Sequence, residues 1–470
     1  FTLDRPSYGP FMQNCEDPQL RKQMYLAYNT RAVGGENDNT EIVRKIAALR
    51  LEIARLLGYD CWADYVLEEN MAKNTETVMS FLEKLMTPSL PFARREVQTV
   101  YGYAVAHGFR ETAEKAGLPF HTLMPWDFSY WAERYKEAEY SLNDEQLKPY
   151  FRLENCIDAV LGLAGKLYGI SFEERTDIPV YHKDVKVYDV RDNDGRHLAL
   201  FYADFFPRST KRGGAWMTEF RGQRIENGVE ERPLVSIVLN FSKPTENAPS
   251  LLTHDELTTF LHEFGHSLHG MFAEGRYPSL CGTNVARDFV ELPSQIMENW
   301  AFEAEYLESF ARDYRTGEVI PKSLITRIVN AKNYLAGYYQ VRQLDFGELD
   351  MAWHTLKAQP KEDTLDFENA ALEDYRVLPH YPGTAISTSF GHIFSGGYSA
   401  GYYSYKWAEV LEADAFALFQ EKGIFDRETA ESFRREILSK GDSVDPAVLY
   451  RNFRGHEPDS QALMKKLGLV

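Results

Sequence analysis

Two histidines four residues apart, with a glutamate beside the first, constrain this chain more than any other feature. They belong to the pentad His262-Glu263-Phe264-Gly265-His266. Residues four apart lie on the same face of an α-helix, so both imidazoles can reach one metal ion. Glu263 then lies beside the coordination position that is left for water. The pentad therefore predicts a helix that carries a metal site.

The residues around the pentad predict the bounds of this helix. Thr253 and Glu256 have the spacing of a capping box, which marks a helix start. An apolar face follows in helical rhythm, formed by Leu257, Phe260, Leu261, Phe264 and Leu268. We expect a metal-binding helix at about residues 254–272.

The type of metal site follows from the residues available as ligands. Structural zinc takes four protein ligands, usually with thiolates, whereas catalytic zinc takes three and leaves one position to water. No pair of cysteines here has zinc-finger spacing, and H-E-x-x-H is the arrangement found in zinc peptidases. His269 shares the helix face, but a straight helix diverges from a metal held by two of its turns. We expect His269 to pack or to support a ligand.

Candidates for the third ligand lie downstream, in residues 288–300, where we expect a second helix that begins near Pro293. Glu291, Gln295 and Glu298 fall on one stripe of that helix. A solvated helix face is the alternative interpretation. The flanking residues are apolar, and carboxylates in such surroundings need a cation or a partner.

Three sequence blocks resemble one enzyme family. HEFGHSLHG is followed by GTNVARDFVELPSQIMENW and then by FGHIFSGGYSAGYYSYKW. In this order they resemble the thimet oligopeptidase family of zinc metallopeptidases, and within it the bacterial peptidyl-dipeptidases. The resemblance implies that His262, His266 and Glu291 bind one Zn²⁺ ion and that Glu263 is the general base. Members usually carry a long helical N-terminal segment, so this chain is expected to be the C-terminal catalytic portion.

The third block spans residues 390–407 and contains four glycines. Tyr398, Tyr402 and Tyr405 recur at i, i+4 and i+7, so they share a face if a helix starts there. In a chain with 28 Tyr, a packed aromatic stripe is the alternative. The resemblance assigns His392 and Tyr405 to stabilising an oxyanion and Tyr398 to contacting substrate.

A small sheet is expected shortly before the metal helix. Residues 185–190 and 197–204 alternate as strands, with a turn at 192–195, and a third strand is expected at 234–241. Zinc peptidases commonly bind an extended peptide at a sheet edge. Gly213-Gly214 would allow close approach of a peptide, although such a pair is also typical of a plain loop.

The basic loop before this glycine pair contains Arg208, Lys211 and Arg212. These cations are candidates for binding the C-terminal carboxylate of a substrate. A solvated basic loop is the alternative.

Long helical patterns dominate the rest of the chain, at residues 40–57, from 74 past 101, 323–356 and 401–419. We therefore expect a mainly α, zincin-type fold with two helical lobes around a deep channel. Residues 1–170 would form one lobe. Residues 171–470 would form the catalytic region, with the sheet at about 180–241, and the lobes would interleave in space.

Charge and cysteine content limit the partners and the compartment. A net charge of −18 argues against binding to nucleic acid or to anionic membranes. Four scattered cysteines, at 15, 61, 156 and 281, predict free thiols in a reducing compartment. No stretch is long and apolar enough for a membrane span. We expect a cytoplasmic monomer, with the periplasm as the alternative location.

Together these features predict a zinc-dependent peptidase that acts on short unfolded peptides and releases C-terminal dipeptides. An oligopeptidase of the same family that cuts internally is the first alternative. A peptide-binding protein that has lost catalysis is the second, and the presence of every residue that catalysis requires argues against it.

Overall fold

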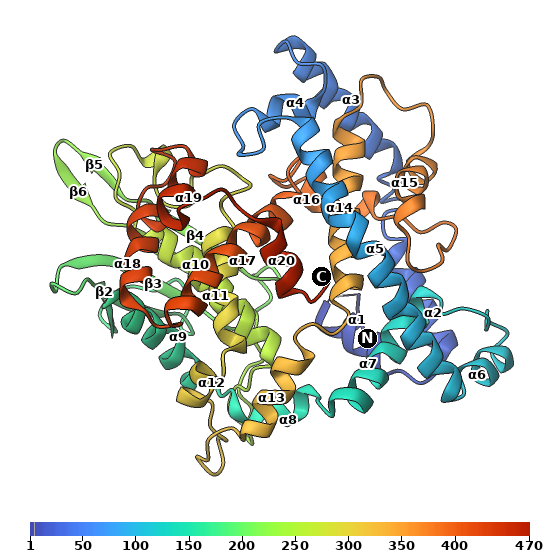
Figure 1. Cartoon of the computed structure of the whole chain (residues 1–470), viewed down its shortest axis with the longest axis horizontal. Helices are drawn as coiled ribbons and strands as arrows, with labels where there is room; N and C mark the ends of the chain where they lie inside the picture. Colours follow the sequence, from blue (N-terminus) through green and yellow to red (C-terminus); the bar gives the residue numbers. More distant parts are fainter. Residues whose placement is uncertain (4) are drawn as a thin grey trace. The chain divides into compact units, whose positions relative to one another are not determined.

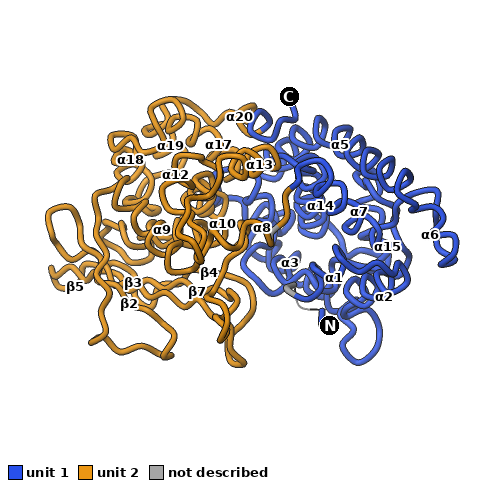
Figure 2. Tube along the Cα trace, turned by 90° about the horizontal axis from the view of Figure 1, so that it is seen from below, with its two compact units in different colours: residues 1–141, 333–406, 464–470 blue, residues 142–332, 407–463 orange. Residues whose placement is uncertain are grey.

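The computed structural model describes residues 1–3 and 5–470, without the side chains of residues 5, 6 and 144. The chain forms two compact units, each built from non-contiguous segments (Figure 2). Unit 1 comprises residues 1–141, 333–406 and 464–470, and unit 2 comprises residues 142–332 and 407–463. The expected division at residue 170, with a channel between two lobes, remains a prediction.

Unit 1 is helical (Figure 1). Its helices are α1 (Arg5–Asn14), α2 (Pro18–Asn29), α3 (Thr40–Leu56), α4 (Trp62–Leu67), α5 (Thr75–Ala106), α6 (Phe109–Lys115), α7 (Pro125–Tyr140), α14 (Ala336–His354), α15 (Thr364–Leu372) and α16 (Gly391–Phe394). Two further helices, α17 (Ser404–Lys422) and α20 (Ser460–Lys466), begin in one unit and end in the other.

Unit 2 combines helices with two small sheets. Its helices are α8 (Asp144–Leu147), α9 (Leu153–Tyr168), α10 (His254–Met271), α11 (Leu292–Glu298), α12 (Ala304–Phe310), α13 (Lys322–Ala331), α18 (Arg427–Phe433) and α19 (Pro446–Arg454). Its strands are β1 (Ser171–Glu174), β2 (Lys186–Arg191), β3 (His197–Asp204), β4 (Trp216–Arg221), β5 (Arg224–Glu226), β6 (Val229–Glu231) and β7 (Leu234–Val238).

The larger sheet is mixed, with strand order β1-β2-β3-β7-β4. The β3–β7 pair is parallel and the other neighbours are antiparallel. The expected strands at 185–190, 197–204 and 234–241 correspond to β2, β3 and β7. The edge strands of this sheet, β1 and β4, were not predicted from the sequence. The fold is thus mainly α with a small mixed sheet, as predicted.

Helix α10 packs against this sheet through aromatic side chains. The rings of Phe260 and Phe205 lie 5.3 Å apart, and those of Phe264 and Phe201 lie 5.7 Å apart. Both phenylalanines of α10 are fully buried. Each aromatic side chain buried in this way removes a large apolar area from water, so the sheet gives the metal helix a rigid support.

The long helices were predicted with mixed accuracy. Those at 40–57 and from 74 past 101 are confirmed as α3 and α5. The prediction of a single helix at 323–356 is wrong. Helix α13 ends at Ala331, and Leu335 adopts a left-handed backbone conformation (φ 55°) before α14 begins. The helix expected from Gly401 begins three residues later, at Ser404.

The four cysteines lie in the described part of the chain as free thiols. Burial raises the pKa of Cys61 and of Cys281 above the ordinary value, so these two are poor nucleophiles at neutral pH. Over the described residues, no helix combines the length and the apolar character needed to cross a bilayer.

Candidate active site

The N-terminus of α10 is fixed as its sequence predicts. The backbone N–H of Glu256 donates to Oγ1 of Thr253 over 3.1 Å, and the N–H of Thr253 donates to Oε2 of Glu256 over 2.8 Å. This capping box satisfies two backbone donors at the helix start. The helix therefore begins at His254 and carries His262 and His266 on consecutive turns.

Gly265, within the pentad, allows a second element to approach the metal helix. A Cβ atom built on Gly265 would lie 2.6 Å from the Cα of Ser294, and closer still to the carbonyl oxygen of Pro293. No side chain fits there, so the start of α11 lies directly against α10. This contact brings Glu291, the residue before α11, next to the two histidines.

Three potential ligand atoms converge as a result. Oε2 of Glu291 lies 3.4 Å from Nε2 of His262 and 3.2 Å from Nε2 of His266. His262, His266 and Glu291 form a group whose ligand atoms all lie within 4.8 Å of one another. Two imidazoles and one carboxylate are the donor set of a catalytic zinc site.

Two further side chains orient these candidate ligands. Nδ1 of His262 lies 2.7 Å from Oε1 of Glu298. A carboxylate accepts from Nδ1–H and so leaves Nε2 free to bind a metal. Oγ of Ser294 donates to Oε2 of Glu291 over 3.0 Å. Glu298 was predicted to lie on the polar stripe, although its partner was not predicted, and Ser294 was not among the predicted site residues.

The histidines and carboxylates of the site shift one another's pKa values toward the charged forms. Burial acts to lower the pKa of His262, but the carboxylates of Glu291 and Glu298 outweigh it and raise that pKa well above the ordinary value. Burial acts to raise the pKa of Glu291, but His266 and His262 hold it well below the ordinary value. Glu291 is thus an anion suited to binding a cation.

Glu263 is buried and only partly satisfied. It is 5% exposed, and its Oε2 is buried with no hydrogen-bond partner among the described residues. Burial raises its pKa above the ordinary value. A buried carboxylate oxygen without a donor is costly, and a water molecule on a metal at the three ligand atoms would supply that donor. The residues present therefore fit a catalytic metal ion.

His269 does not belong to the group of candidate ligands. It is fully buried, and neither ring nitrogen has a hydrogen-bond partner within the described part of the chain. Burial, together with His266, lowers its pKa to about 3. His269 is therefore a neutral, packed side chain, as expected.

Residues 391–405, which we call the tyrosine segment, lie in unit 1. Their candidate site residues come together there, although not on one helix. Tyr398 and Tyr402 precede α17, which contains only Tyr405. The rings of Tyr398 and Tyr405 nevertheless stack, with their centroids 5.0 Å apart, and the ring centroids of Tyr402 and Tyr405 lie 5.2 Å apart. The ring centroid of His392, in α16, lies 6.0 Å from that of Tyr398 and 6.4 Å from that of Tyr405. The prediction that the three tyrosines share one helix face was wrong, but His392 and these tyrosines do form a cluster.

Two cations of the basic loop are already bound within the protein. Nζ of Lys211, whose side chain is 2% exposed, donates to the carboxylate of Asp204 and to the carbonyl oxygens of Asp204, Phe206 and Leu239. Arg208 donates to both carboxylate oxygens of Asp204. Both side chains stabilise the end of β3, which leaves Arg212 as the candidate for binding a substrate carboxylate.

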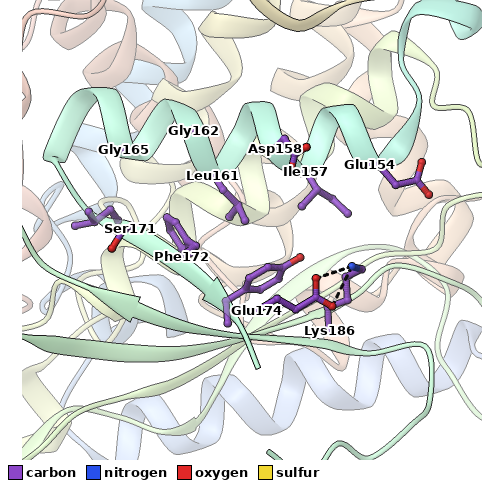
Figure 3. A pocket seen from close by; sticks show the side chains of 12 residues that line it. Glu154, Ile157, Asp158, Leu161, Gly162, Gly165, Ser171, Phe172, Glu174 and Lys186 are labelled. Carbon is purple, nitrogen blue, oxygen red and sulfur yellow. Dashed lines mark hydrogen bonds and ion pairs between the residues drawn. The ribbon is translucent and has the colours of Figure 1, made fainter. Parts of the chain in front are cut away.

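A separate pocket of about 460 Å³ lies in unit 2 between α9 and strands β1 and β2 (Figure 3). Leu161 and Phe172 point into it, and the ion pair of Glu174 with Lys186 (2.9 Å) lies at its side. None of the candidate metal ligands lines this pocket, so it is distinct from the metal site.

The mainly helical fold, the metal helix packed on a small sheet and the His-His-Glu site define a zincin-type metallopeptidase. The sequence model for peptidase family M3 matches residues 11–469, and the chain belongs to this family of metal-dependent peptidases.

Similar proteins support this assignment. Oligopeptidase A of Escherichia coli (strain K12) is 40% identical over 477 residues, which cover 100% of this chain and 68% of that protein. The dipeptidyl carboxypeptidase of Salmonella typhimurium (strain LT2) is 39% identical, over 98% of this chain and 66% of that protein.

Solved structures share the fold at low sequence identity. PZ peptidase A with inhibitor 2 has a TM-score of 0.59 at 16% identity, covering 100% of this chain and 70% of that one. The M32 carboxypeptidase from Deinococcus radiodurans R1 has a TM-score of 0.57 at 15% identity, covering 99% and 81%.

The close approach at Gly265 gives a first test. Gly265→Ala should push α11 away from α10, displace Glu291 and weaken metal binding by about a hundredfold or more. Competition with a fluorescent zinc chelator measures the affinity. Gly102→Ala is the matched control, because a Cβ at this exposed position of α5 meets nothing within 4 Å. Unchanged affinity in Gly265→Ala would contradict the packing account.

Proposed function

We propose that this chain is a zinc-dependent peptidase that hydrolyses short, unfolded peptides. The main support is one juxtaposition: the ligand atoms of His262, His266 and Glu291 converge beside a buried Glu263 oxygen that lacks a donor. Two imidazoles and a carboxylate leave one position for water in catalytic zinc sites. All the residues for catalysis are present, which argues against an inactive peptide-binding protein.

Glu263 carries the proton transfers in this proposal. A zinc ion bound by the three ligands would lower the pKa of a water molecule and polarise the peptide carbonyl. Glu263 would accept the proton from that water and deliver it to the nitrogen of the leaving amine. Burial raises the pKa of Glu263, which brings its proton affinity closer to that needed for both transfers at neutral pH.

The tyrosine segment supplies the other polar groups in this proposal. His392 and Tyr405 would donate hydrogen bonds to the oxyanion that forms when water attacks the carbonyl. Tyr398, stacked on Tyr405, would contact substrate. The hydroxyl of Tyr402 donates to Oε1 of Gln343 over 3.1 Å, which supports a packing role for that residue.

Edge strand β4 is the candidate for binding the peptide backbone. It follows the Gly213-Gly214 loop and pairs with β7 at the end of the sheet. The side chain of Asn240 fixes this loop through hydrogen bonds to the carbonyl oxygens of Arg212 and Gly214. An extended peptide along β4 would gain main-chain hydrogen bonds without a requirement for particular side chains.

Two modes of peptide cleavage are candidates. Release of C-terminal dipeptides is the proposed mode, and relatives named dipeptidyl carboxypeptidase at 38–39% identity support it. Internal cleavage is the second candidate, because relatives named oligopeptidase A reach 40% identity. The binding of Arg208 and Lys211 to Asp204 also favours the second mode, since it leaves fewer cations for a terminal carboxylate.

C-terminal amidation separates the two modes. It removes one charge from the substrate and leaves the other contacts intact. If the cation that binds this carboxylate positions the scissile bond, amidated peptides should be cut at least about tenfold more slowly than free acids. Mass spectrometry of the products should show dipeptides released stepwise from the free acids. Equal cleavage of both forms at internal bonds would instead establish the second mode.

The free thiols of all four cysteines support a reducing compartment, and we propose a cytoplasmic location. A monomer remains the expectation.

A further inference from the structure

A buried carboxylate in α14 binds the turn that precedes α17. Asp350 is fully buried. Its carboxylate accepts the backbone N–H groups of three consecutive residues, Ala400, Gly401 and Tyr402, each over 2.8 Å. Three successive N–H groups that point at one anion form a backbone nest. Ala400 adopts a left-handed conformation (φ 52°), which a residue with a Cβ holds only when its surroundings enforce it.

Asp350 is one end of a chain of polar groups. Nδ1 of His354 lies 2.7 Å from Oδ1 of Asp350, and Nε2 of His354 lies 2.7 Å from Nη1 of Arg50. A guanidinium group only donates hydrogen bonds. Nε2 of His354 must therefore accept from Arg50, and Nδ1–H must donate to Asp350. This arrangement makes the imidazole neutral and fixes its tautomer.

Arg50 binds the other half of the tyrosine segment. Its Nη1 donates to the carbonyl oxygen of Ile393 over 2.7 Å, and its Nη2 donates to that of Phe394 over 3.4 Å. Both carbonyls belong to α16, the short helix that contains His392. The chain Arg50–His354–Asp350 therefore joins the backbone beside His392 to the backbone of the turn before Tyr405.

The geometry points to a specific role: we propose that Asp350, His354 and Arg50 are positioning residues that set the place of His392 relative to Tyr405. All the groups involved lie within unit 1. The inference rests on the proposed function, because it assigns importance to this distance only if both side chains donate to one oxyanion. Donors that stabilise an oxyanion must be held to a fraction of an ångström.

A double-mutant cycle distinguishes positioning from general stabilisation. Asp350→Asn replaces one carboxylate oxygen by an N–H₂ group that cannot accept the backbone donors. On the zinc-loaded chain it should lower kcat by about tenfold to a hundredfold and change KM by less than about twofold. Combined with Tyr405→Phe, it should add less than about threefold to the loss caused by Tyr405→Phe alone, because it acts through Tyr405. Losses that multiply in the double variant would overturn the inference.

Amide hydrogen exchange gives a readout that does not depend on activity. In Asp350→Asn the backbone amides of residues 400–402 should exchange at least about tenfold faster. The matched control is Asp127→Asn, which removes a buried carboxylate of the same unit that pairs with Arg21. This control should leave both kcat and the exchange of residues 400–402 unchanged. Unchanged exchange in Asp350→Asn would show that the carboxylate does not hold the turn and would overturn the inference.

A second variant removes only the contact between His354 and Arg50, and it serves as the test if Asp350→Asn does not fold. In His354→Asn the side-chain amide can still donate to Asp350 in place of Nδ1 but does not reach Arg50. We expect kcat to fall, again non-additively with Tyr405→Phe; an unchanged kcat would contradict the role of Arg50. Failure of the proposed function itself would be distinct, since the unsubstituted zinc-loaded chain would then hydrolyse no peptide.

Discussion

Replacing Glu263 with glutamine is expected to lower kcat by about a hundredfold to ten-thousandfold while the chain keeps one bound metal ion. The amide has nearly the same shape as the carboxylate but cannot accept a proton from water. Glu263 is not among the three grouped ligand residues, so its loss should leave the metal in place. Steady-state kinetics on a quenched peptide, with metal content from mass spectrometry, measure both properties in one preparation.

Asp255→Asn is the matched control for this substitution. Asp255 is an exposed acid in the first turn of the same helix, and its replacement should change kcat by less than about twofold. If Glu263→Gln loses the metal together with activity, Glu263 belongs to the ligand set and the proposed division of roles is wrong.

The second large effect concerns metal affinity. Glu291→Gln should weaken zinc binding more than about a hundredfold, because it removes the anionic ligand and leaves a neutral oxygen. Glu298→Gln should weaken it only about tenfold to a hundredfold, since Glu298 orients His262 without binding the metal itself. Competition titrations of both variants against the same chelator give the two affinities directly.

The order of these two effects is the informative result. Weaker binding in Glu298→Gln than in Glu291→Gln would exchange their roles and make Glu298 the ligand. Equal small effects would mean that neither carboxylate contacts the metal.

The local features of this site could be predicted from sequence because each depends on residues close in the chain. The capping box of Thr253 and Glu256, the apolar face of α10 and the pairing of His262 with His266 all follow from helical spacing. Strand β3 was predicted at its observed bounds, 197–204, because its alternation and the turn residues that precede it, at 192–195, mark it clearly. The choice of Glu291 as the candidate third ligand required the resemblance to a family, since nothing local distinguishes it from Gln295 or Glu298.

The features that sequence did not predict depend on contacts between distant segments or on backbone conformation. Periodicity continues through residues 332–335, so it did not reveal the left-handed Leu335 between α13 and α14. Likewise the helical pattern of residues 401–419 predicted a helix that begins at Gly401. There, Asp350 binds the N–H groups of residues 400–402 and holds them in a turn. The charges of Arg208 and Lys211 suggested a carboxylate site, but the backbone of the loop turns so that both side chains bind Asp204, at the end of β3.

The most direct test of the central claim is anomalous X-ray diffraction, at the zinc edge, from crystals of the zinc-loaded chain. The account predicts one strong peak within about 2.0–2.2 Å of Nε2 of His262, Nε2 of His266 and a carboxylate oxygen of Glu291, with Glu263 next to the remaining position. A peak bound by other residues, or a zinc ion that is fully enclosed by four protein ligands, would contradict it.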